Sequence, residues 1–215
     1  PTLGNMHALL AGHLFENEDN QHEAIAHYKL AFDHAPFRGK AFDALIRIYS
    51  EQRNADEIAK VFKAASVNDP IGLADALFDA GATDRAAKIY AKELGKKPTR
   101  GQLALLVRHE LALATSGDWP GVFETLGKRL PLTEDDEERA LIEAHRRWVL
   151  SERMADSDEA WDFYRKLHED HPDDAEVLEN LARIAGARGE SKLAIQFLDG
   201  LSKIAATAED AARYQ

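Results

Sequence analysis

The sequence contains no cysteine, which excludes disulfide bridges and cysteine-based metal sites. No apolar run approaches the roughly 20 residues that a transmembrane helix requires. Positive charge is scarce: 27 lysines and arginines face 38 aspartates and glutamates, which leaves a formal net charge of −11. This deficit argues against binding to nucleic acid, whose partners gather Lys and Arg against phosphates, and against an anionic membrane surface.

The sequence motifs of common enzymes are also missing or incomplete. There is no glycine-rich phosphate loop followed by lysine and no Gly-x-Ser-x-Gly elbow. His109–Glu110 begins like the helix motif of zinc proteases, but Leu113 stands where the second histidine is required. His168 and His171 fall at the predicted end of a helix, where we interpret them as solvated residues favoured by the helix dipole. The sequence therefore predicts no catalytic residue, no metal site, no cofactor and no enzymatic activity.

Two copies of a 34-residue pattern organise the first third of the chain. Within each copy, apolar and small residues recur three or four apart, which is the spacing of one helix face. A fixed period of this size with two apolar runs predicts stacked pairs of helices, and the proline is expected to end the second helix of each pair. The first copy is marked by Ala8, Ala11, Gly12, Phe15, Ala24, Tyr28, Ala31 and Pro36, and the second by Phe42, Leu45, Ile46, Tyr49, Ile58, Phe62, Ala65 and Pro70.

Weaker copies follow, so the predicted fold is a single all-α solenoid of about six helix pairs over residues 1–215. The third copy is six residues short, and we expect the missing turn at the start of its first helix, because Asp69–Gly72 is a poor helix former. Asn54 and Thr133 are the expected N-caps of two helices. The predicted repeats are 4–36, 37–70, 71–98, 99–132, 133–172 and 173–206, with 207–215 as the start of a cap or of a truncated further repeat.

The order of small, aromatic and proline residues in the two clear copies resembles the tetratricopeptide repeat (TPR) family. The resemblance implies a right-handed superhelix of antiparallel helix pairs, with a concave groove lined by the first helix of each pair. It also marks Trp148 as a bulky residue at a usually small position, so repeats four and five are expected to pack unusually. The groove positions that it implies here are Leu9, His13, Lys40, Asp43, Arg47, Asp75, Phe78, Asp79, Val107, Leu111, His145, Val149, Glu179 and Arg183.

These features favour a non-enzymatic scaffold that binds a peptide segment or a partner helix in its groove, because a mixed charged and apolar groove suits such partners. The chain is expected to be part of a longer bacterial protein or multiprotein assembly. Leu9, His13 and Ala44 stand where chaperone-binding members of the family carry Lys and Asn, so that clamp is not expected. Two alternatives remain: a periplasmic segment of a polysaccharide-export or envelope-assembly machine, and the regulatory repeat arm of an enzyme. A cysteine-free chain suits the cytoplasm and the periplasm alike.

Overall fold

In the computed structural model, residues 2–15 and 20–204 are described, and every regular element within these ranges is a helix. The predicted all-α fold class is therefore confirmed. The chain divides between Gly117 and Asp118 into two compact units, unit 1 and unit 2, and the single solenoid expected for the whole chain stays a prediction. The expected cap or further repeat at 207–215 lies outside the described residues. No described helix is both long and apolar enough to cross a bilayer.

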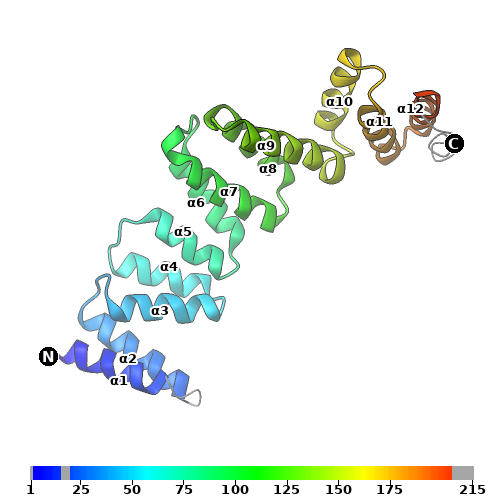
Figure 1. The fold of residues 1–215 in the computed structure, drawn as a ribbon. Helices are drawn as coiled ribbons and strands as arrows, with labels where there is room; N and C mark the ends of the chain where they lie inside the picture. Colours follow the sequence, from blue (N-terminus) through cyan, green and yellow to red (C-terminus); the bar gives the residue numbers. More distant parts are fainter. Residues whose placement is uncertain (1, 16–19, 205–215) are drawn as a thin grey trace. The chain divides into compact units, whose positions relative to one another are not determined.

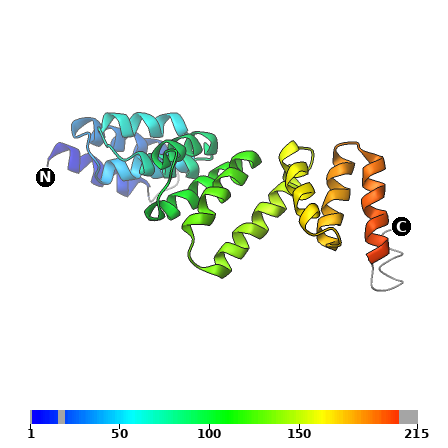
Figure 2. The same ribbon diagram turned by 90° about the horizontal axis from the view of Figure 1, so that it is seen from above.

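Unit 1 is built from helices that pack side by side as hairpins, as both ribbon views show (Figure 1 and Figure 2). α1 pairs with α2, α3 with α4 and α5 with α6, while α3 also packs directly against α5. The contact between α3 and α5 brings the first helices of successive pairs onto one face. The helices are α1 (Leu3–Phe15), α2 (Gln21–His34), α3 (Lys40–Glu51), α4 (Ala55–Ala64), α5 (Pro70–Asp79), α6 (Thr83–Leu94) and α7 (Leu103–Ser116), with a 3-10 turn η2 (Arg100–Gln102) before α7.

Small residues allow these helices to approach closely, and aromatic residues fill the space between them. Ala24, Ala74 and Ala86 are fully buried, as their place in the repeat pattern predicts. Phe42 of α3 meets Phe62 of α4 edge to face, with ring centroids 5.0 Å apart. The apolar period of the sequence thus becomes the core of unit 1.

The ends of α4 and α5 correct one prediction and confirm another. The Asn54 side chain accepts a 3.3 Å hydrogen bond from the Glu57 amide, so it is the N-cap that we predicted. Pro70 does not end α4 but occupies the first turn of α5, where its missing N–H costs little. α4 has 10 residues against 14 in α2, whereas α5 has 10 against 12 in α3. α4 stops before Ser66 takes a left-handed conformation (φ 52°). α5 begins at Pro70 itself, whereas α3 begins four residues after Pro36, so two of the six missing residues come from the helix and four from the segment before it.

Unit 2 is less regular, and a π-helical turn lies at its centre. This turn, η4, contacts α8, α10 and α11, and its residues Val149 and Leu150 are fully buried. α11 and α12 form a hairpin in both ribbon views (Figure 1 and Figure 2). The elements are α8 (Trp119–Arg129), the 3-10 turn η3 (Leu130–Leu132), α9 (Asp136–Trp148), η4 (Val149–Arg153), α10 (Asp158–Asp170), α11 (Ala175–Ala187) and α12 (Ser191–Ile204).

The start of α9 contradicts the prediction that Thr133 is its N-cap. Asp135 fills that role, because its carboxylate accepts a 2.7 Å hydrogen bond from the Glu138 amide. The turn η3 prolongs α8, so Thr133 lies at the end of that segment and donates its hydroxyl to the Arg129 carbonyl over 3.1 Å. A threonine near a run of acidic residues was not enough to distinguish the end of one helix from the start of the next.

Candidate functional site

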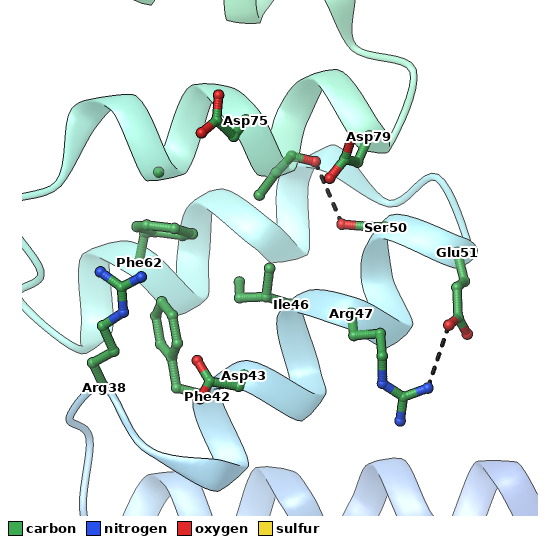
Figure 3. A pocket seen from close by; sticks show the side chains of 12 residues that line it. Arg38, Phe42, Asp43, Ile46, Arg47, Ser50, Glu51, Phe62, Asp75 and Asp79 are labelled. Atoms are coloured by element: carbon green, nitrogen blue, oxygen red, sulfur yellow. Dashed lines mark hydrogen bonds and ion pairs between the residues drawn. The ribbon is translucent and has the colours of Figure 1, made fainter.

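Two neighbouring hollows lie on the face of unit 1 that α3, α5 and α7 form. The first has a volume of about 570 Å³ and lies mainly between α3 and α5 (Figure 3), and the second, of about 360 Å³, is lined from α5, α6 and α7. Because both include Asp75 and Asp79, we treat them as one surface, the unit-1 groove. Its lining residues are Arg38, Phe42, Asp43, Ile46, Arg47, Ser50, Glu51, Phe62, Gly72, Asp75, Ala76, Phe78, Asp79, Tyr90, Arg108 and Leu111.

The groove has an apolar component that changes in exposure from one end to the other. Phe42 and Phe62 are buried beneath the first hollow, whereas Ile46 is half-buried. At the second hollow, Leu111 of α7 is 54% exposed, and Val107, one helical turn earlier, is 45% exposed. A single exposed apolar side chain needs no explanation, but two on one helix face beside a concavity are typical of a contact surface.

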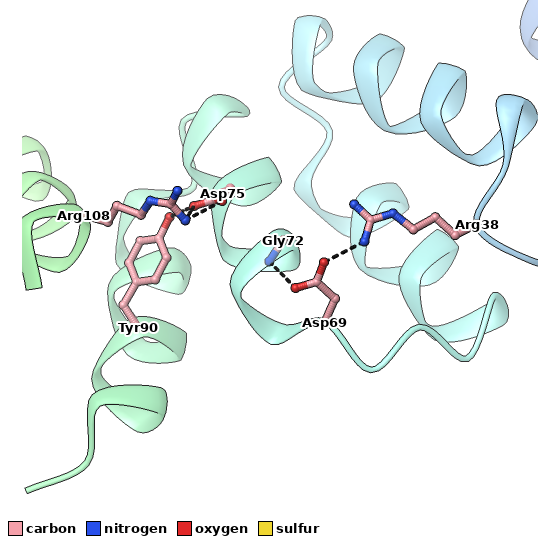
Figure 4. A network of polar contacts seen from close by, with 6 residues as sticks. All are labelled: Arg38, Asp69, Gly72, Asp75, Tyr90 and Arg108. Carbon is pink, nitrogen blue, oxygen red and sulfur yellow. Dashed lines mark hydrogen bonds and ion pairs between the residues drawn. The ribbon is translucent and has the colours of Figure 1, made fainter. Parts of the chain in front are cut away.

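A polar network joins the three helices at the middle of the groove (Figure 4). Tyr90 of α6 donates its hydroxyl to Asp75 of α5 over 2.6 Å, and Arg108 of α7 donates to the same carboxylate at 2.9 and 3.3 Å. Burial raises the pKa of Tyr90 well above its ordinary value, and the hydrogen bond to the Asp75 charge raises this pKa further. Tyr90 therefore remains a neutral donor, and it holds Asp75 in place together with Arg108.

A second network fixes the start of α5 against the segment before α3 (Figure 4). Asp69 accepts a 2.8 Å hydrogen bond from the Gly72 amide and pairs with Arg38, also at 2.8 Å. The Gly72 amide lowers the pKa of Asp69, and the Arg38 guanidinium lowers this pKa further, against the opposing effect of partial burial. Arg38 thus lines the groove with its charge already neutralised.

Contacts along α3 complete the wall of the first hollow. Arg47 pairs with Glu51 one turn later at 3.3 Å, and the Ser50 hydroxyl donates a 3.4 Å hydrogen bond to the Ala76 carbonyl of α5 (Figure 3). In contrast, neither Asp43 nor Asp79 has a cation of the described residues within ion-pairing distance. The groove therefore has an excess of negative charge.

The structure brings together six of the fourteen groove residues that we predicted. Asp43, Arg47, Asp75, Phe78 and Leu111 all line the unit-1 groove, as does Asp79. Their role in binding stays a prediction, but their placement on one face agrees with the expected first-helix positions.

Most of the other predicted residues lie elsewhere. Lys40, together with Leu9, lines a separate hollow of about 700 Å³ formed with α1 and α2, and His13 is exposed on α1. His145 and Arg183 belong to unit 2, where His145 lies against the Trp148 ring with centroids 5.7 Å apart. In unit 2, Arg183 forms an ion pair with Glu152 and donates a hydrogen bond to the Asn180 side chain.

One predicted groove residue is buried instead. Val149 has no exposed surface, because it lies two turns after the buried Ile142 on the same helix face. Trp148, which the resemblance places in the packing, is 40% exposed and meets Trp119 edge to face at 5.9 Å. The burial expected at these two neighbouring positions is therefore reversed, and the π turn η4 begins at the buried Val149.

Two important groove residues were not predicted. Arg108 lies three residues before Leu111, so helical spacing already places it on the same face and could have identified it. Tyr90 was assigned to the core, which is correct for its ring at 2% exposure, but its hydroxyl reaches Asp75. Among residues 2–15 and 20–204, no group of three or more metal-ligating side chains has a geometry that could hold a metal ion.

These observations define an all-α protein of paired helices with a groove that is both apolar and acidic. Neither a family model nor a curated protein matches the chain. A solved structure described as "Functional Characterization of Pseudomonas Aeruginosa pilF" is similar over 99% of this chain and 96% of that chain, with 15% sequence identity and a TM-score of 0.39.

Proposed function

We propose that this protein is a TPR-like, non-enzymatic scaffold that binds a segment of a partner protein in the unit-1 groove. The observation that carries the proposal is the exposed apolar surface of Leu111 and Val107 beside a concavity lined from α3, α5, α6 and α7. A few apolar anchors in such a groove supply most of the binding energy for an extended peptide or a partner helix.

The contacts between helices support this proposal because they make the groove rigid before a partner arrives. The Ser50–Ala76 hydrogen bond joins α3 to α5, and the bonds of Asp75 join α5 to α6 and α7. A surface that is already ordered loses less conformational entropy on binding. The envelope-assembly segment and the regulatory arm of an enzyme, the two alternatives from the sequence, stay predictions.

Selection of short random peptides on the full chain tests the proposal. Peptides that bind are then measured by calorimetry against the chain and against the variant Leu111→Asn. Because Leu111 is exposed, this change is expected to leave the fold intact and to weaken peptide binding by about tenfold or more, as loss of an interface anchor does.

The variant Leu30→Asn is the matched control. Leu30 is 45% exposed on α2, the second helix of the first pair in unit 1. The substitution therefore removes a comparable apolar surface, but away from the groove. The proposal requires that Leu30→Asn keep the original affinity and that circular dichroism show both variants folded. Selected peptides that bind Leu111→Asn as tightly as the original chain would contradict it.

A further inference from the structure

Each arginine that lines the unit-1 groove already has a carboxylate partner within this chain. The groove therefore offers no unneutralised arginine for an acidic partner. The three pairs are Arg38–Asp69 at 2.8 Å, Arg47–Glu51 at 3.3 Å and Arg108–Asp75 at 2.9 Å.

Two carboxylates of the same groove are left over. Asp43 on α3 and Asp79 on α5 are both exposed, and they come from the two helices that form the first hollow (Figure 3). Within the described residues, no lysine, arginine or histidine pairs with either of them. The groove thus combines two uncompensated negative charges with the apolar side chains of Ile46 and Leu111.

Physical chemistry limits what can cover such a surface. An apolar segment would remove water from both carboxylates without replacing their hydrogen bonds, which is costly. An acidic segment would add repulsion between like charges. A cationic side chain avoids both costs, and neighbouring apolar side chains can then cover Ile46 and Leu111.

We infer that the segment held in the unit-1 groove carries Lys or Arg side chains that pair with Asp43 and Asp79, next to apolar side chains that contact Ile46 and Leu111. The inference rests on the proposed function of the groove and specifies the chemistry of its partner. The partner is a basic and apolar stretch of protein, and its association is faster and tighter at low ionic strength.

The selected peptides provide the test. Their composition is compared with that of the starting library, and the affinity of the best peptide is measured for the double variant Asp43→Asn, Asp79→Asn. Enrichment of Lys or Arg beside apolar residues is expected. The double variant should weaken binding by about tenfold and reduce its dependence on salt, because two charge pairs are lost.

The double variant Asp33→Asn, Asp84→Asn is a closely matched control. This control also removes two negative charges from unit 1. The positions match as well, because Asp84, like Asp43, lies in a first helical turn, and Asp33, like Asp79, lies near the end of a helix. Any effect of helix-end charge on folding is thus shared by both variants. The control should retain its affinity within about twofold, since long-range effects of exposed charges are largely screened.

The possible results separate this inference from the proposed function. Neutral or acidic peptides that bind Leu111→Asn poorly but bind the Asp43, Asp79 variant normally would overturn the inference and leave the groove as the binding site. Peptides whose binding responds to neither change would overturn both. Equal weakening by the groove pair and the control pair would show a general charge effect and would also overturn the inference.

Discussion

The hydroxyl of Tyr90 on α6 donates a 2.6 Å hydrogen bond to the carboxylate of Asp75 on α5. The same carboxylate accepts a hydrogen bond from Arg108 of α7 at 2.9 Å, so one acidic side chain joins three consecutive helices at the middle of the groove. Its charge is used inside the chain, which is why Asp75 differs from Asp43 and Asp79 even though all three line the same surface.

Removing the Tyr90 hydroxyl should destabilise unit 1. We expect Tyr90→Phe to lower the free energy of unfolding by about 1.5–3 kcal/mol, because a part-buried hydrogen bond to a charged acceptor is lost. Urea denaturation followed by circular dichroism measures the change. In a double-mutant cycle with Asp75→Asn, the two changes should be non-additive, and strict additivity would show that the pair is not energetically coupled.

The same tyrosine should limit stability at alkaline pH. Burial raises the pKa of Tyr90 above its ordinary value of 10.0, so the folded state holds this proton where the unfolded state releases it. The stabilisation from this group is fully present below pH 10 and is lost as the pH rises through the folded pKa. Measured unfolding free energies should fall above about pH 10, and the fall should be less steep in Tyr90→Phe. An identical pH dependence in both proteins would contradict the assignment.

Asp69 should make the opposite contribution in acid. Its pKa is lowered from the ordinary value of 3.8, first by the Gly72 amide and also by Arg38, so its stabilisation is present above that value and is lost as the pH falls through the folded pKa. At neutral pH, Asp69→Ala should cost about 1 kcal/mol as a lost N-cap.

Asp69→Asn is the informative comparison for this site, because asparagine still caps a helix but carries no charge. It should retain most of the stability at neutral pH and show a weaker loss of unfolding free energy in acid. The measurement is chemical denaturation across a series of pH values. If Asp69→Asn lost as much stability at neutral pH as Asp69→Ala, the charge and not the cap would dominate.

The small residues of the repeat pattern should tolerate little enlargement. Ala74 of α5 has no exposed surface, so Ala74→Leu should lower the free energy of unfolding by about 1–3 kcal/mol through overpacking. Ala91→Leu on the exposed side of α6 is the control, and it should change stability by less than about 0.5 kcal/mol. Thermal denaturation of the two variants side by side gives the comparison. A neutral Ala74→Leu would mean that α5 packs less tightly than the structure indicates.

The sequence was most informative where the deciding physics is local. Periodic apolar residues predicted the helices, and the Asn54 cap was recognised because capping depends on residues three apart. The prediction failed at Thr133, Pro70 and Val149, where a 3-10 turn, a shortened α4 and the π turn changed which residue occupies each position. Such irregularities leave only a weak trace in a repeat pattern.

From the amino-acid order alone follow the paired helices, because helical spacing relates residues that are close in the chain. The resemblance to the TPR family, and not the spacing, implied that Asp43, Asp75 and Leu111 are groove positions. Folding in three dimensions decided which charges remain available in that groove. Asp75 meets Tyr90 and Arg108, which are 15 and 33 residues away, and Arg38 meets Asp69 across 31 residues. Contacts between residues so far apart in the chain depend on how the helices pack. The two uncompensated carboxylates can therefore be identified only in the folded chain, and the chemistry that we infer for the partner depends on them.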